Sequence, residues 1–114
     1  MLFRSTQWGN IAGLVAGLMK PDFGLIGRSL NDVVAEPIRS VLIPGFDKIK
    51  ELAIKEGALG CGISGSGPTI FALCMEREHA TRVGSVIQNQ FASYKLSSEV
   101  YVSKINQEGA RIIE

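Results

Sequence analysis

The middle of the chain holds residues that could form a pocket for an anion. Residues 60–67 contain four glycines and two serines. Glycine permits a positive φ and a close backbone approach, so such a loop can direct several N–H groups into one concave space. Serine hydroxyls can donate or accept hydrogen bonds there, and Pro68 stiffens the exit from the loop. The same composition also suits a tight structural loop that binds nothing.

Three well-known glycine motifs do not match this loop. The GxGxxG spacing that begins at Gly60 resembles a dinucleotide fingerprint, but that motif follows a strand and opens a helix. Here helix-like sequence comes before it, and Pro68 with an apolar run comes after it. A P-loop would require Lys and a hydroxyl residue after Gly65, where the chain has Ser-Gly. A nucleophile elbow would require a further glycine, and the only histidine, His79, lies at a charged helix start.

Arg39 is the second residue suited to binding a ligand. It lies among apolar residues in a proline-bounded segment, 35–44, that we expect to be an irregular link. A guanidinium group can grip a carboxylate or a phosphate with two parallel hydrogen bonds. The alternatives are an ion pair with Glu36 or a place on the open surface. Asn10, near the start of the first expected helix, is a weaker candidate for a side chain that points into a site.

Composition excludes several classes of function. The chain has 114 residues, which fits one domain, and 12 basic against 11 acidic side chains give a net charge of +1. We therefore expect no nucleic-acid partner. The apolar run at residues 11–19 is too short to span a membrane, and no signal peptide is evident. Cys61 and Cys74 suit buried thiols better than a disulfide or a zinc site. We expect no metal site and a location in the reducing cytoplasm.

Hydrophobic periodicity predicts helices and strands along the whole chain. The expected helices are 5–20, 23–34, 46–56 and 78–94, and the expected strands are 60–64, 69–74, 98–105 and 110–113. Strands joined by short turns favour an α+β fold, an antiparallel sheet of about four strands with helices packed on one face.

Details of the helices lead to further expectations. Glycines at 9, 13 and 17 should let another element pack closely on the first helix, and Trp8 should be a packing residue. Asp22 should cap the second helix, and Arg28 should pair with Asp32 on its exposed side. We expect His79 to be exposed and inert.

Two segments and the end of the chain resemble a known family. Residues 57–73, Gly-Ala-Leu-Gly-Cys-Gly-Ile-Ser-Gly-Ser-Gly-Pro-Thr-Ile-Phe-Ala-Leu, resemble the third motif of the GHMP kinases, and most closely that of the homoserine kinase branch. Residues 35–46, Ala-Glu-Pro-Ile-Arg-Ser-Val-Leu-Ile-Pro-Gly-Phe, resemble a second motif of that branch at the separation the family shows. Gly109-Ala-Arg111 is similar to its ending. The resemblance runs from about Gln7 to the end and corresponds only to the C-terminal portion of such kinases.

The resemblance implies a fold, a reaction and site residues. The fold would be the ferredoxin-like GHMP kinase C-terminal domain, a single domain over residues 1–114 without the N-terminal ATP-binding domain. The reaction would be transfer of a phosphoryl group from ATP, with Mg²⁺, to the hydroxyl of L-homoserine in threonine biosynthesis. Arg39 would grip the substrate carboxylate. The loop Ser64, Gly65, Ser66 and Gly67 would lie near the phosphate site. Ile38 departs from the tyrosine that many members carry, so the lining of that pocket is not fixed by the resemblance.

Some parts of such an enzyme have no counterpart in this sequence. There is no second Ser/Gly-rich loop followed by a helix, and no pair of acids placed for Mg²⁺. We assign no catalytic residue and no metal ligand. We expect a fragment that is inactive alone, binds neither ATP nor Mg²⁺ tightly, and has the N-terminal GHMP kinase domain as its partner. Apolar surface left bare in such a fragment would favour a homo-oligomer.

Three alternatives stay open at this point. The chain could belong to another GHMP small-molecule kinase, although the 35–46 motif favours the homoserine branch. It could be a stand-alone amino-acid-binding module of ferredoxin-like shape, because Arg39 and the glycine loop suit a carboxylate equally well. It could also be a structural domain that only dimerises.

Overall fold

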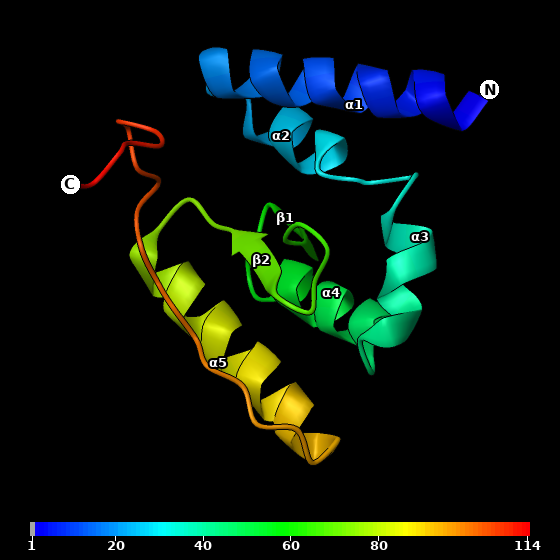
Figure 1. Ribbon diagram of the computed structural model, residues 1–114, viewed down its shortest axis with the longest axis vertical. Helices are drawn as coiled ribbons and strands as arrows, with labels where there is room; N and C mark the ends of the chain where they lie inside the picture. The colour runs from blue at the N-terminus through cyan, green and yellow to red at the C-terminus, as the bar shows by residue number, and fades with distance from the viewer. Residues whose placement is uncertain (1) are drawn as a thin grey trace.

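The computed structural model describes residues 2–114 and has an α+β architecture, as predicted. Figure 1 shows a short central hairpin, with helices α1 and α2 on one side of it and helices α4 and α5 on the other. The elements in chain order are α1 (Leu2–Met19), α2 (Phe23–Ser29), α3 (Glu36–Arg39), the 3₁₀ helix η1 (Ser40–Leu42), α4 (Phe46–Lys55), β1 (Gly60–Ile63), β2 (Ile70–Leu73) and α5 (Arg77–Ser93).

Helix α1 packs closely on α2 through two of its glycines. A Cβ atom built on Gly17 would lie 2.8 Å from Cγ1 of Ile26, and one on Gly13 would overlap the hydroxyl of Ser29. The close approach predicted from the glycine spacing is confirmed at these two positions. The third glycine, Gly9, faces open space. Trp8 was expected to pack, but it is exposed in this chain.

Helix α2 begins as predicted and ends earlier than predicted. Asp22 caps it, accepting a 3.0 Å hydrogen bond from the N–H of Leu25. The helix ends at Ser29, whereas the apolar pattern had suggested residue 34. The expected pairing of Asp32 with Arg28 is wrong, because the Asp32 carboxylate accepts from backbone N–H groups of the next segment instead. Those bonds favour a turn at that point rather than another helical turn.

The link at 35–44 is more regular than expected. It contains α3 and the 3₁₀ helix η1, so the prediction of an irregular segment is wrong. Pro37 lies in the first turn of α3, where a missing N–H costs nothing and the fixed φ suits a helix. The isoleucine that follows η1, Ile43, is buried and anchors the link to the rest of the chain.

The core lies between the hairpin and the two helices α4 and α5. Strands β1 and β2 pair antiparallel, which confirms the predicted hairpin. The fully buried cluster consists of small and medium-sized apolar residues from all of these elements: Ala53, Ala58, Cys61 and Val83, with Ala72, Cys74 and Ile87 packed against them. Helices α4 and α5 therefore face the core through Ala53 and Val83. His79, expected to be exposed, is half-buried against Gly57, at the turn that follows α4.

The predicted four-stranded sheet is wrong, because only two strands form within residues 2–114. Residues 98–105 and 110–113 were expected to be strands, but neither is hydrogen-bonded into a ladder. In Figure 1 the chain after α5 turns back and runs along that helix as an extended tail. The alternation is retained only in part, since Val102 is half-buried and Tyr101 is 84% exposed, but Val100 is 40% exposed as well. The tail has the side-chain pattern of a strand without a backbone partner.

None of the helices formed by residues 2–114 has the length and apolar character needed to cross a membrane.

Candidate functional site

The structure brings Arg39 and the glycine loop together. Arg39 ends α3, and its guanidinium Nη1 donates to the carbonyl oxygen of Ser66 at 3.2 Å. The two residues are 27 positions apart, so this contact depends on the packing of the link against the hairpin. Both are exposed. One donor of the guanidinium holds the loop, and its remaining donors make no hydrogen bond to the described residues.

Arg39 does not pair with Glu36, which was one alternative for it. The Glu36 carboxylate instead accepts from Nζ of Lys50 at 2.6 Å. The side chains of this pair are 12% and 24% exposed, so the charges are largely withdrawn from water. The pair connects α3 to α4 and leaves Arg39 without an acidic partner among the described residues.

The glycine loop is a tight turn that exposes its polar groups. The Ser64 N–H donates to Thr69 at 2.8 Å, and the Gly67 N–H donates to the Ser64 carbonyl at 3.1 Å. Gly65 and Gly67 have φ values of +60° and +79°, a region that glycine occupies without strain. Added Cβ atoms would meet nothing within 4 Å at Gly65, so the requirement for glycine there is conformational.

Several hydrogen-bond donors of this loop have no partner among the described residues. Within the described chain, the N–H groups of Gly65 and Ser66 have no backbone partner, and the hydroxyls of Ser64 and Ser66 have no partner. All three residues are exposed. Neighbouring amides and hydroxyls of this kind form an anion-binding concavity when an anion is present. The Arg39 guanidinium beside them adds a positive charge to the same surface.

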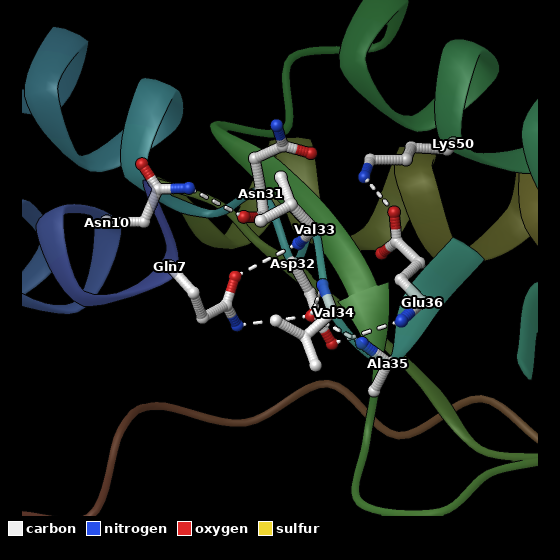
Figure 2. Close-up of polar contacts among 9 residues, drawn as sticks. All are labelled: Gln7, Asn10, Asn31, Asp32, Val33, Val34, Ala35, Glu36 and Lys50. Atoms are coloured by element: carbon white, nitrogen blue, oxygen red, sulfur yellow. Dashed lines mark hydrogen bonds and ion pairs between the residues drawn. The ribbon is translucent and has the colours of Figure 1, made fainter. Parts of the chain in front are cut away.

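A polar cluster that sequence reasoning missed lies between α1 and the start of α3, as Figure 2 shows. The Asp32 carboxylate accepts from the N–H groups of Val34 and Ala35, each at 2.9 Å, and of Glu36 at 3.2 Å. The Gln7 amide donates to the same carboxylate at 3.1 Å, and its oxygen accepts from Val33 at 3.0 Å. Asp32 therefore accepts from the turn that leads into α3 and from its first residue, and it ties this segment to α1.

Burial and hydrogen bonds act in opposite directions on the Asp32 carboxyl. Burial alone would raise its pKa, but hydrogen bonds from the N–H groups of Ala35, Val34 and Glu36 and from the Gln7 amide outweigh it, so the pKa is lowered. Asp32 is thus fully ionised at neutral pH. Its role is to fix the backbone that leads to Arg39.

Asn10 contributes to the edge of this cluster. Its side-chain amide donates to the carbonyl of Asn31 at 2.8 Å, as Figure 2 shows. None of the hydrogen bonds formed within residues 2–114 joins Asn10 to Arg39 or to the glycine loop. The two binding residues predicted from sequence are therefore not brought into one contact.

An open groove of about 450 Å³ lies beside the cluster. It is lined by Asn31, Asp32, Val33, Glu36, Pro37, Ser40, Val41 and Asp47. Arg39, whose guanidinium contacts the glycine loop, is not among these residues. Three carboxylates and no basic side chain line the groove, which makes it a poor site for a phosphate or a carboxylate. Among residues 2–114, no group of three or more His, Cys, Asp and Glu side chains is arranged to hold a metal ion.

Comparison with known protein families identifies the class. A family model described as GHMP kinases C terminal matches residues 14–93, which span the glycine loop, Arg39 and all of the core. The chain belongs to this GHMP kinase C-terminal family.

Its similar relatives are homoserine kinases. The chain is 52% identical over 109 residues to the homoserine kinase of Chlorobaculum tepidum and 54% identical over 109 residues to that of Chlorobium phaeovibrioides. Each match covers 94% of this chain and 34% of the relative, so the chain spans about a third of the length of these curated relatives. The crystal structure of homoserine kinase from Cytophaga hutchinsonii is similar with a TM-score of 0.91 and 51% identity, covering 99% of this chain and 36% of that one.

Proposed function

We propose that this chain is the part of a homoserine kinase that holds the amino-acid substrate against the phosphate site. The reaction is transfer of the terminal phosphoryl group of ATP to the hydroxyl of L-homoserine, a step toward threonine. One observation carries the proposal: Arg39 lies in hydrogen-bond contact with Ser66 of the glycine loop. About 50% identity to proteins named homoserine kinase supports the choice of substrate.

Arg39 and the glycine loop would have different tasks in this site. Arg39 presents unused guanidinium donors on an exposed surface, and a bidentate grip on the substrate carboxylate would fix the direction in which the hydroxyl points. The loop Ser64, Gly65, Ser66 and Gly67 would place N–H and hydroxyl donors near the phosphoryl oxygens. Phosphoryl transfer is accelerated mainly by such positioning and charge stabilisation. The Arg39–Ser66 bond sets the distance between the two.

The other parts of the active site would come from another polypeptide segment. The described residues offer no acidic ligand set for Mg²⁺, so we derive no step through the metal. In this proposal the Mg²⁺ ligands and most contacts to ATP belong to the part of the relatives that has no counterpart here. The chain alone would bind ATP and Mg²⁺ weakly. A reducing cytoplasm and self-association through exposed apolar side chains such as Ile38, Val41 and Leu42 stay our predictions.

The test is a coupled ADP-release assay with ATP, Mg²⁺ and L-homoserine. The chain is assayed alone and together with the N-terminal part of the Chlorobaculum tepidum homoserine kinase. We expect turnover only from the combination. Turnover by the chain alone would contradict the division of tasks. No turnover from a combination that binds homoserine without ATP would favour an amino-acid-binding module instead.

Arg39 is then tested in the active combination. Arg39→Ala removes a charge-assisted grip worth about 1.5–3 kcal/mol, so KM for homoserine should rise about 10- to 100-fold. Arg39→Lys keeps the charge but loses the bidentate geometry, and it should restore only part of the affinity. Arg28→Ala, an exposed arginine on α2, is the matched control and should leave KM unchanged. An Arg39→Ala variant with the wild-type KM would refute the assignment.

A further inference from the structure

Helix α3 carries Arg39 without an apolar anchor of its own. None of the four residues of this helix is buried, and Ile38, next to Arg39, is 74% exposed. Within residues 2–114 its side chains are held by two polar contacts: Glu36 pairs with Lys50, and Arg39 donates to the Ser66 carbonyl. Because little packing holds this short helix, its polar contacts control where the guanidinium lies and which charge it meets.

Glu36 and Arg39 lie one turn apart on the same helix. A carboxylate and a basic side chain at this spacing are neighbours on a helix surface and attract each other. Lys48 and Glu51 form such a pair on α4, at 3.5 Å. Glu36 and Arg39 do not, because the Glu36 carboxylate accepts from Nζ of Lys50 at 2.6 Å, as Figure 2 shows. Lys50 therefore occupies the only carboxylate that α3 contains.

The Lys50–Glu36 pair lies in a place that water reaches poorly. The two side chains are only 24% and 12% exposed. Nζ of Lys50 lies 6.0 Å from the centre of the Phe46 ring, which is 3% exposed. The other oxygen of Glu36 lies 3.5 Å from where a Cβ atom on Gly62 would be, so the carboxylate borders β1. A carboxylate in such a place, left without its ammonium partner, strongly favours another cation. On α3 that cation is Arg39.

We propose that Lys50 is a positioning residue that keeps the Arg39 guanidinium free for an anionic ligand. By neutralising Glu36, it prevents this carboxylate from pairing with Arg39 one turn away. Lys50 thus sets the affinity of the site through Arg39. The consequence for homoserine rests on the proposed function, whereas the pairing state of Arg39 does not. A clamp that merely joined α3 to α4 would need both members of the pair, but in this proposal the harm comes from an unpaired Glu36.

Modification of arginine by phenylglyoxal tests the pairing state in the chain alone, with peptide mass mapping to locate each product. A guanidinium paired with a carboxylate reacts more slowly than a free one. The reference within the same molecule is Arg28, which is exposed and has no acidic partner within residues 2–114. Lys50→Ala should slow the modification of Arg39 about 3- to 10-fold relative to Arg28. The double variant Lys50→Ala/Glu36→Gln should restore the wild-type rate, because no carboxylate remains to capture Arg39.

Two outcomes of this experiment overturn the proposal. One is an unchanged rate at Arg39 in Lys50→Ala. The other is equal slowing in the single and the double variant, since the cause would then be a displaced α3. Lys48→Ala is the matched control and should leave the rate unchanged, because its ion pair is exposed and lies elsewhere. Should Lys50→Ala not fold, Lys50→Gln takes its place: it keeps a hydrogen-bond donor to Glu36, removes the charge and should slow the reaction in the same direction.

Kinetics of the active combination with the Chlorobaculum tepidum N-terminal part test the consequence for the substrate. Lys50→Ala should raise KM for homoserine about 3- to 10-fold and leave kcat within about twofold of wild type. Lys50→Arg and Lys50→Ala/Glu36→Gln should both keep the wild-type KM. A KM that stays raised in the double variant overturns the proposal. Wild-type KM in Arg39→Ala would instead refute the proposed function, and the pairing would then stand or fall on the phenylglyoxal result.

Discussion

Replacing Asp32 with alanine tests whether the polar cluster of Figure 2 holds α3 in place. The Asp32 carboxylate is the acceptor for four donors: the N–H groups of Val34, Ala35 and Glu36 and the side-chain amide of Gln7. The alanine variant leaves all four without that acceptor. Because α3 carries Arg39 at its end, its position decides where the guanidinium lies.

The expected loss follows from two contributions. A lost helix cap costs about 1 kcal/mol, and a hydrogen bond to a charged group about 1.5 kcal/mol. Asp32→Ala should therefore lower the free energy of unfolding by about 2–3 kcal/mol, a fall of roughly 8–12 °C in the melting temperature at this size. Gln7→Ala should cost less, and the double variant should show a coupling of about 1 kcal/mol between Gln7 and Asp32.

The pH dependence gives a second readout. The pKa of the folded Asp32 carboxyl lies below its unfolded value, because its hydrogen bonds outweigh burial. Its contribution to stability is therefore fully present above the unfolded pKa and is lost as pH falls through the folded one. The difference between wild type and Asp32→Ala should be constant near pH 7 and shrink below about pH 4.

Urea unfolding followed by far-UV circular dichroism at pH 7 and pH 3 measures both effects. Asp32→Asn is the matched variant, since it keeps one acceptor oxygen and removes the titration. It should fall between wild type and alanine at pH 7. A loss below about 0.5 kcal/mol for Asp32→Ala, which is the range of neutral surface changes, would refute the structural role given to the cluster.

Three further predictions test the packing. Gly17→Ala should destabilise the chain by about 1–3 kcal/mol, because the added methyl group overpacks against α2. Gly9→Ala has open space around it, so it should be neutral or stabilise the chain by up to about 1 kcal/mol. Equal melting temperatures of the two variants would contradict the packing of α1 on α2. Lys50→Ala should lower the free energy of unfolding by about 2 kcal/mol, because it leaves the largely buried Glu36 carboxylate without its partner. The control Lys48→Ala, at an exposed lysine, should lower it by less than about 0.5 kcal/mol in urea unfolding. Burial raises the pKa of the Cys61 thiol to about 11, so only roughly one molecule in a thousand is ionised at pH 8; rapid alkylation in the native state would disprove its burial.

Most elements of the fold could be predicted from local sequence. The glycine spacing of α1 and the Asp22 cap are short-range features whose physical cause lies within a few residues. The hairpin followed from two apolar runs around a glycine loop. The predicted end of α2 was wrong because the apolar periodicity continues past Ser29. The hydrogen bonds that compete with a longer helix join backbone N–H groups such as that of Ala35 to the Asp32 carboxylate, and Asp32 had been assigned to an ion pair on the helix.

The site was predicted in part. Arg39 and the loop were both identified, and their contact through Ser66 could not be, because it depends on how α3 packs on the hairpin. Asp32 was missed because its carboxylate had been assigned to an ion pair with Arg28 on an extended α2. The Gln7 contact, from 25 residues away, has no local signal at all.

The tail explains why a correct pattern gave a wrong structure. Alternation along 98–105 reports which side chains face the core, and that part holds for Val102, which is half-buried, and Tyr101, which is exposed, but not for the exposed Val100. A strand also needs a neighbour whose backbone groups it can bond, and period-two alternation carries no information about that neighbour. In this chain α5 supplies the side-chain contacts, but no segment within residues 2–114 supplies the backbone ones. The strand was therefore predicted wrongly because its backbone partner cannot be predicted from the alternation within residues 98–105.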